Sequence, residues 1–166
     1  MKSKGPHWWV KIGDFGISKR AEKGITALRT FSGTPGFLAP EILIQQGLLD
    51  YPDLESGREY TVAVDIWSLG EIAFRALTGG QPFPRLGAYV NGRSPFPIDV
   101  LQKYGISKEG CDFLKSLLAP IPKDRLTAKE ALFHIWFEPQ KMLLGRELDE
   151  KERYLFKSYN TIDHQV

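Results

Sequence analysis

The sequence predicts a mainly α-helical domain with one short strand near its start and a long loop behind that strand. Apolar residues recur at helical spacing over residues 61–79. Two later segments, 107–119 and 127–136, each open on a Ser or Thr that is suited to cap a helix. Residues 17–40 are polar and rich in Gly, Ser, Thr, Lys and Arg, so they predict a loop, and a loop of that length is usually functional.

Composition restricts the class of protein. The chain has 166 residues, of which 42% are hydrophobic and 25% charged, and this balance favours one globular domain over a disordered chain. A net charge of +2 is too small to indicate a nucleic acid or a membrane surface as partner. No apolar run reaches the ~18–20 residues that a membrane span needs. The single cysteine, Cys111, excludes an internal disulfide and favours a cytoplasmic or nuclear setting.

The first elements follow from local signals. Residues 8–12 alternate weakly and include Trp, Val and Ile, so they predict a short strand. Pro40 and Glu41 predict the start of a short helix, because proline suits the first helical position and an acid suits the first turn.

The longest helix is expected over residues 61–79. Thr61 is placed to cap it and Gly79 to end it. Its apolar residues fall on two faces, a pattern that predicts burial nearly all round. We therefore expect this helix to stand at the centre of the domain.

Shorter helices are expected toward the C-terminus. Residues 79–97 contain many Pro and Gly and predict a loop. The three helices expected after it are a brief one over 97–104, one over 107–119 with Ser107 as its cap, and one opened by the capping box Thr127–Glu130.

Four motifs then occur in a fixed order along the chain. They are Asp14-Phe15-Gly16, the run Gly33–Glu41, the run Asp65–Gly70 and the run Pro122–Leu132. In this order and spacing they resemble the C-terminal half of a eukaryotic protein kinase domain of the serine/threonine type. The resemblance covers about residues 10–137. It implies a protein-kinase-like C-lobe fragment, with residues 1–140 as a partial kinase domain and 141–166 as a charged tail.

The resemblance implies a metal site at the first motif. Asp14 stands where the family holds Mg²⁺ on the phosphates of ATP. Phe15 would be the switch residue whose packing decides whether Asp14 faces the metal, and Gly16 would permit the backbone to swing.

Residues 17–38 would form the activation segment. Thr30 lies where many relatives carry an activating phosphate from an upstream kinase, and Thr26 and Ser32 compete for that role. An ordinary loop threonine is the alternative for Thr30.

The run after Gly33 implies a substrate-binding turn. Thr34, Pro35, Gly36 and Phe37 stand where the family binds its protein substrate, and Thr34 implies serine/threonine specificity. Phe37 departs from the tyrosine that is common in relatives, which removes a hydroxyl group and keeps the ring.

Three charged residues are assigned structural roles by the same resemblance. Glu41 and Arg125 would form a buried ion pair that ties the activation segment to the helical body. Asp65 would hold the backbone of the catalytic loop, because a charge on an otherwise apolar helix needs a partner.

Several parts that the family uses in catalysis do not occur in the sequence. It contains no Gly-rich phosphate loop, no ATP-clamping lysine motif and no His-Arg-Asp catalytic base, so no catalytic residue is assigned. We expect the isolated chain to transfer no phosphate and to bind ATP and Mg²⁺ weakly or not at all. We also expect an open edge on the strand 8–12, an exposed apolar face on the helix 61–79, and marginal stability or dependence on a partner.

Two readings of function follow. In the first, the chain is part of a working serine/threonine kinase whose missing N-terminal half completes it, acting on a protein substrate. In the second, it is a non-catalytic remnant that acts as a protein-interaction module. The presence of Asp14, Thr30 and Thr34 favours the first reading, because a remnant has no use for a metal ligand.

Overall fold

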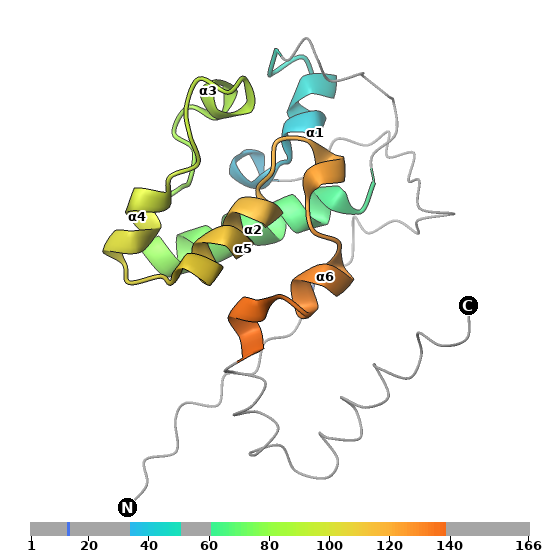
Figure 1. Ribbon diagram of the computed structural model, residues 1–166. Helices are drawn as coiled ribbons and strands as arrows, with labels where there is room; N and C mark the ends of the chain where they lie inside the picture. Colours follow the sequence, from blue (N-terminus) through green and yellow to red (C-terminus); the bar gives the residue numbers. More distant parts are fainter. Residues whose placement is uncertain (1–12, 14–33, 51–60, 139–166) are drawn as a thin grey trace, which may run out of the picture.

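The computed structural model describes residue 13 and residues 34–50 and 61–138 (Figure 1). Helices are the regular elements of this described part, and it contains no strand. The α-helices are α1 (Pro40–Gln45), α2 (Ala63–Thr78), α3 (Leu86–Val90), α4 (Ile98–Lys103), α5 (Lys108–Leu117) and α6 (Ala128–Leu132). Short 3-10 helices are η2 (Pro35–Phe37), η3 (Pro122–Asp124) and η4 (Ile135–Phe137). The mainly helical fold class is therefore confirmed.

The core is built around α2 and α5, which lie side by side at the centre of the molecule (Figure 1). Trp67 and Phe74 of α2 and Leu114 of α5 are almost completely buried. Gly70 makes the close approach possible, because a Cβ built there would stand 2.7 Å from Cγ of Leu118. The central position expected for the longest helix is confirmed.

One face of α2 departs from expectation. The two-faced apolar pattern predicts burial nearly all round, yet Val62, Leu69 and Ile72 are 59%, 47% and 55% exposed. These residues recur at helical spacing and form an apolar stripe that no described element covers. Burial all round was therefore wrong, whereas the expected exposed apolar face is present.

The ends of α2 follow local chemistry. The Thr61 hydroxyl accepts a hydrogen bond from the Ala63 N–H at 3.3 Å, although Val62 occupies the cap position itself. Gly79 ends the helix with φ of 72°, the left-handed conformation in which glycine carries no Cβ penalty.

The segment 79–97 is more ordered than its Pro and Gly content predicts. It contains the helix α3, and the Tyr89 hydroxyl donates a hydrogen bond to the Leu118 carbonyl oxygen at 2.8 Å. The Phe83 and Tyr89 rings stack with centroids 4.0 Å apart, and Phe96 packs beside them. The prediction of a loop was wrong for residues 86–90, because buried aromatic rings bind this segment to the core.

The capping predictions in the last third of the chain are confirmed. The Ser107 hydroxyl accepts from the Gly110 N–H at the start of α5. At the start of α6 the Thr127 hydroxyl accepts from the Glu130 N–H, while the Glu130 carboxylate accepts from the Thr127 N–H at 2.7 Å. The last helix ends sooner than expected, because His134 is extended and its Nδ1 accepts from the Trp136 N–H to open η4.

Some predictions fall outside the described residues. These are the strand 8–12, most of the loop 17–40 and the charged tail 141–166. Within the described ranges, no helix has both the length and the apolar character that crossing a membrane requires.

Candidate functional site

The candidate site is the turn at residues 34–37, which precedes α1. The Phe37 N–H donates to the Thr34 carbonyl oxygen at 2.9 Å and closes η2. Thr34 and Gly36 are exposed, whereas the Phe37 side chain is half-buried. Leu38 is half-buried, and Ala39 and Pro40 after it are buried. The turn is therefore an exposed loop that is anchored in the core directly after its last residue.

The central helix holds this turn by its backbone carbonyl groups. The Ser68 hydroxyl donates to the Phe37 carbonyl oxygen at 2.9 Å. Nη2 of Arg75 donates to the Gly36 carbonyl oxygen at 2.6 Å. The guanidinium carbon of Arg75 also lies 4.4 Å from the centroid of the Phe37 ring, within the range of a cation–π contact. Two residues of α2 thus contact two successive residues of the turn.

Glu71 lies beneath Arg75 and orients it. Nε and Nη2 of Arg75 donate to Oε2 of Glu71 at 3.2 and 3.1 Å. Burial raises the pKa of the Glu71 carboxyl above its ordinary value, and the hydrogen bond and charge of Arg75 act in the opposite direction. Neither residue was singled out from the sequence. The available signal was an acid four residues before a base on a helix, which predicts the pair and not its contact with the turn.

A second acid–base pair joins α1 to the segment after α5. Nη1 and Nη2 of Arg125 donate to Oε1 and Oε2 of Glu41, both at 2.7 Å. The Arg125 side chain is 0% exposed and that of Glu41 9% exposed. The two residues that the motifs pair therefore form a bidentate, buried ion pair.

Arg125 uses its remaining donors on backbone carbonyl groups. Nε donates to the Ala119 oxygen at 2.8 Å, Nη1 to the Ala63 oxygen at 2.9 Å and Nη2 to the Pro120 oxygen at 3.1 Å. The guanidinium carbon also lies 5.1 Å from the Trp67 ring centroid. This one side chain therefore ties the starts of α1 and α2 to the end of the α5 region.

Asp65 lies in the first turn of α2 and is exposed. Its side chain has no hydrogen-bond partner among the described residues. The catalytic loop that Asp65 is expected to hold does not occur in this sequence, so this role of Asp65 stays a prediction.

The other predicted site residues lie outside the described residues. These are the metal-ligand candidate Asp14, the switch residues Phe15 and Gly16, and the phosphosite candidates Thr26, Thr30 and Ser32. Gly13, which directly precedes Asp14, is described and is exposed. Residues 34–50 and 61–138 contain no group of three His, Cys, Asp or Glu side chains that would hold a metal ion.

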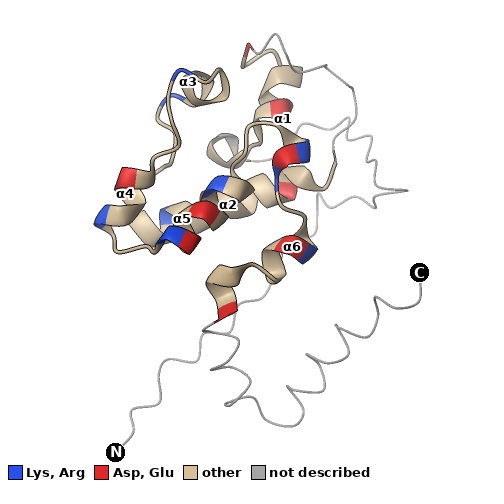
Figure 2. Cartoon of the chain, viewed as in Figure 1, with Lys and Arg blue, Asp and Glu red and all other residues tan. Residues whose placement is uncertain are grey.

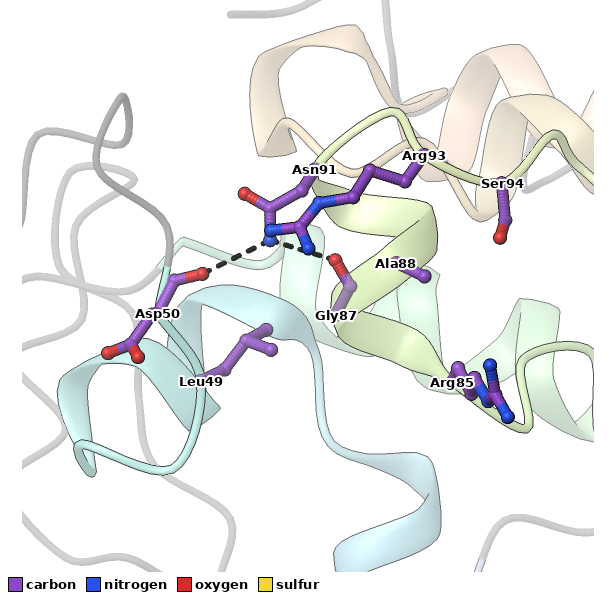
Figure 3. Close-up of a pocket in the computed structure, with 8 residues that line it drawn as sticks. All are labelled: Leu49, Asp50, Arg85, Gly87, Ala88, Asn91, Arg93 and Ser94. Atoms are coloured by element: carbon purple, nitrogen blue, oxygen red, sulfur yellow. Dashed lines mark hydrogen bonds between the residues drawn. The ribbon is translucent and has the colours of Figure 1, made fainter.

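An open cleft of about 640 Å³ lies between α3 and the residues that follow α1 (Figure 3). Asn91 bridges the cleft, because its Nδ2 donates to the backbone carbonyl oxygen of Asp50 at 3.3 Å and to that of Gly87 at 2.8 Å. Arg85 and Arg93 also line it, while the Asp50 carboxylate points away from α3 (Figure 3). Figure 2 shows that α4, α5 and α6 each carry both acidic and basic residues. None of the predicted site residues lines this cleft.

Comparison with known proteins identifies the family. The model of the protein kinase domain matches residues 1–137. The serine/threonine-protein kinase cds1 of Schizosaccharomyces pombe is 37% identical over 132 residues, which cover 77% of this chain and 27% of cds1. RAD53 of Saccharomyces cerevisiae, another serine/threonine-protein kinase, is 37% identical over 135 residues, which cover 78% of this chain and 16% of RAD53.

A crystal structure of Rad53 1–466 in complex with AMP-PNP is also similar, at 34% sequence identity and a TM-score of 0.48. The match covers 64% of this chain and 26% of that one. The chain thus spans about a quarter or less of the length of these relatives. The ordered motifs and the match over residues 1–137 lead to one conclusion: the chain belongs to the protein kinase family and is part of a kinase domain homologous to serine/threonine kinases.

Proposed function

We propose that this chain supplies the substrate-binding turn of a serine/threonine protein kinase, with residues 34–37 as the surface that receives the protein substrate. The observation that supports it best is the attachment of an exposed turn to the central helix at two successive carbonyl groups, those of Gly36 and Phe37. A loop that is held in this way presents one shape to a peptide, which lowers the ordering cost of binding.

The reaction is phosphoryl transfer from ATP to a Ser or Thr hydroxyl of a protein, with Mg²⁺ supplying charge neutralisation on the phosphates when it is bound. Two of the described carboxylates are held in ion pairs, Glu41 by Arg125 and Glu71 by Arg75. The role of metal ligand is proposed for Asp14, and its position in the motif supports it. Thr30, Thr26 and Ser32 remain the proposed targets of an upstream kinase.

The purified 166-residue chain is expected to transfer no phosphate. Its sequence contains no Gly-rich loop, ATP-clamping lysine motif or His-Arg-Asp base, and positioning with charge neutralisation provides most of the rate in phosphoryl transfer. Incubation of the chain with labelled ATP, Mg²⁺ and a general substrate protein tests this expectation. Incorporation that disappears in Asp14→Asn would contradict it.

A second candidate function is a non-catalytic interaction module, and the exposed stripe on α2 favours it. Val62, Leu69 and Ile72 present apolar surface of the kind that protein partners cover. Intact-mass spectrometry of the endogenous product separates the two functions. A product larger than 18.8 kDa whose additional peptides include a His-Arg-Asp motif supports the kinase, and a product of 18.8 kDa supports the module.

A matched pair of glycine variants tests the substrate-binding turn. A Cβ at Gly36 would stand 3.2 Å from Nη2 of Arg75, whereas a Cβ at Gly80 would meet nothing within 4 Å. Gly36→Ala is therefore expected to displace the Arg75 contact and weaken the binding of a Ser/Thr peptide library to the chain. Gly80→Ala is expected to leave binding unchanged. Equal binding by both variants would contradict the proposed role of the turn.

A further inference from the structure

Beside the turn, the positive guanidinium of Arg75 is more exposed to solvent than the carboxylate of its partner Glu71. The Arg75 side chain is 30% exposed, whereas the Glu71 side chain is only 6% exposed. Glu71 lies under Arg75, so solvent and any bound peptide meet the cation first. Glu71 is also the only acidic partner of Arg75 among the described residues.

The hydrogen bonds of Arg75 leave one edge of its guanidinium open. A guanidinium has five N–H donors in a fixed planar fork. Nε uses its hydrogen on Glu71, and Nη2 uses its two on Glu71 and on the Gly36 carbonyl oxygen. Nη1 has no partner in the part of the chain that the structure describes. Two donors of a fixed, permanently charged group therefore remain available at the turn.

Three contacts hold this open edge in place. The guanidinium of Arg75 is hydrogen-bonded to the Glu71 carboxylate and to the Gly36 carbonyl oxygen, and its central carbon lies 4.4 Å from the centroid of the Phe37 ring. Because little side-chain freedom remains to be lost, a carboxylate that reaches Nη1 meets a preorganised donor. A lysine or arginine of a peptide would meet a like charge at the same place.

We propose that Arg75 is a specificity-determining residue, which selects protein substrates that carry an acidic side chain next to the segment lying on residues 34–37. The inference rests on the proposed function of this turn. It names the substrate class as acidic around the accepted Ser or Thr, and it assigns the discrimination to one side chain of α2. Repulsion of basic peptides contributes to the selection together with attraction of acidic ones.

Peptide binding to the purified 166-residue chain tests the proposal without requiring catalysis. The probe is a set of fluorescent Ser/Thr peptides in which one flanking position at a time is Glu, Gln or Lys. The wild-type chain is expected to bind the best Glu peptide roughly two- to fivefold more tightly than its Gln counterpart, the range of an exposed charge pair, and the Lys peptide more weakly. High salt is expected to reduce this preference.

Three variants separate charge from geometry. Arg75→Gln is expected to abolish the preference for Glu, and Arg75→Glu to reverse it toward Lys. Arg75→Lys keeps the charge and loses the planar fork, so it is expected to retain the preference while binding all peptides less tightly. Lys103→Gln removes one exposed positive charge from α4 and serves as the matched control for net charge. Thermal melts of each variant report whether the fold is retained.

The outcomes distinguish this proposal from the one on which it rests. Peptide binding without a Glu preference, or with a preference that Arg75→Gln leaves intact, overturns the role of Arg75 and leaves the turn as a substrate surface. Absence of binding to every peptide overturns both. A preference that Lys103→Gln reduces as much as Arg75→Gln does shows a general charge effect, and also overturns the role of Arg75.

Discussion

Two Glu–Arg pairs of this molecule have the same chemistry and different surroundings. Glu41 and Arg125 come from positions 84 residues apart and meet in the core, with the Arg125 side chain 0% exposed. Glu71 and Arg75 stand one helical turn apart on α2, with the Arg75 side chain 30% exposed. Both arginines also donate to backbone carbonyl groups of other segments.

The difference shows how burial decides what an ion pair does. The buried pair satisfies its charges with a full set of hydrogen bonds, so the loss of either partner strands a charge in the core. In the second pair Glu71 is buried, whereas Arg75 is partly exposed and keeps donors open to solvent, which makes the arginine accessible to a ligand. We therefore expect Glu41 and Arg125 to contribute to the stability of the fold, and Arg75 to contribute to the recognition of a peptide.

The largest effect is expected from Arg125→Ala. Removing the guanidinium leaves Glu41 buried without its partner, and we expect a loss of about 3–5 kcal/mol in the free energy of unfolding. Urea denaturation followed by tryptophan fluorescence measures it. Lys123→Ala, two residues away and exposed, is the control and is expected to change stability by less than about 0.5 kcal/mol. Similar losses in the two variants would remove the basis for separating the pairs.

The next effect addresses the helix that both pairs contact. A Cβ at Gly70 would stand 2.7 Å from Cγ and 2.9 Å from Cδ2 of Leu118, so Gly70→Ala forces α2 and α5 apart. We expect a loss of about 1–3 kcal/mol from this overpacking. Gly80→Ala, with open space around its Cβ, is the matched control. If the urea midpoint of Gly70→Ala equals that of the wild type, α2 and α5 move apart without a loss in the free energy of unfolding.

A pH titration sharpens the contrast at Glu71. The pKa of Glu71 is raised above its ordinary value of 4.5 by burial, so the folded chain binds this proton more tightly than the unfolded chain does. Ionised Glu71 therefore costs stability at neutral pH. The cost falls as the pH drops through the raised folded pKa, and it is absent below about 4.5.

Glu71→Gln is the variant that isolates this contribution. The stability of the wild type relative to Glu71→Gln is expected to increase as the pH is lowered from neutral toward the ordinary value, as measured by urea midpoints at each pH. A difference that stays constant over this range would show that burial at Glu71 is fully offset by Arg75.

A smaller effect on stability than that of Arg125→Ala is expected from Arg75→Gln. Arg75 is 30% exposed, so water replaces part of its contacts, and glutamine keeps a hydrogen-bond donor for the buried Glu71. The local effect is larger, because Gly36 loses the donor to its carbonyl oxygen. Hydrogen exchange is therefore expected to become faster at the Phe37 amide and to stay unchanged at the Leu118 amide, which lies in the core. Faster hydrogen exchange at both amides would show that Arg75, like Arg125, stabilises the whole fold.

Local features of the fold were predictable from the residues. Ser107 and Thr127 cap their helices, and Gly79 ends α2 in the left-handed conformation, because each signal involves backbone groups within a few positions of one another. The segment 79–97 shows the limit of this reasoning. Its Pro and Gly content predicts a loop, while the burial of Tyr89 and Phe96 against the core stabilises α3.

Some features of the candidate site were likewise predictable from the sequence, and others were not. The sequence by itself determined the family, the order of its motifs, the pairing of Glu41 with Arg125 and the position of the turn at residues 34–37. The tertiary structure alone decided that Arg75 reaches Gly36 across 39 residues, and that Ser68 reaches Phe37 across 31 residues. The reason is physical: a cap depends on neighbours along the chain, whereas these contacts depend on how α2 packs against segments distant in the sequence.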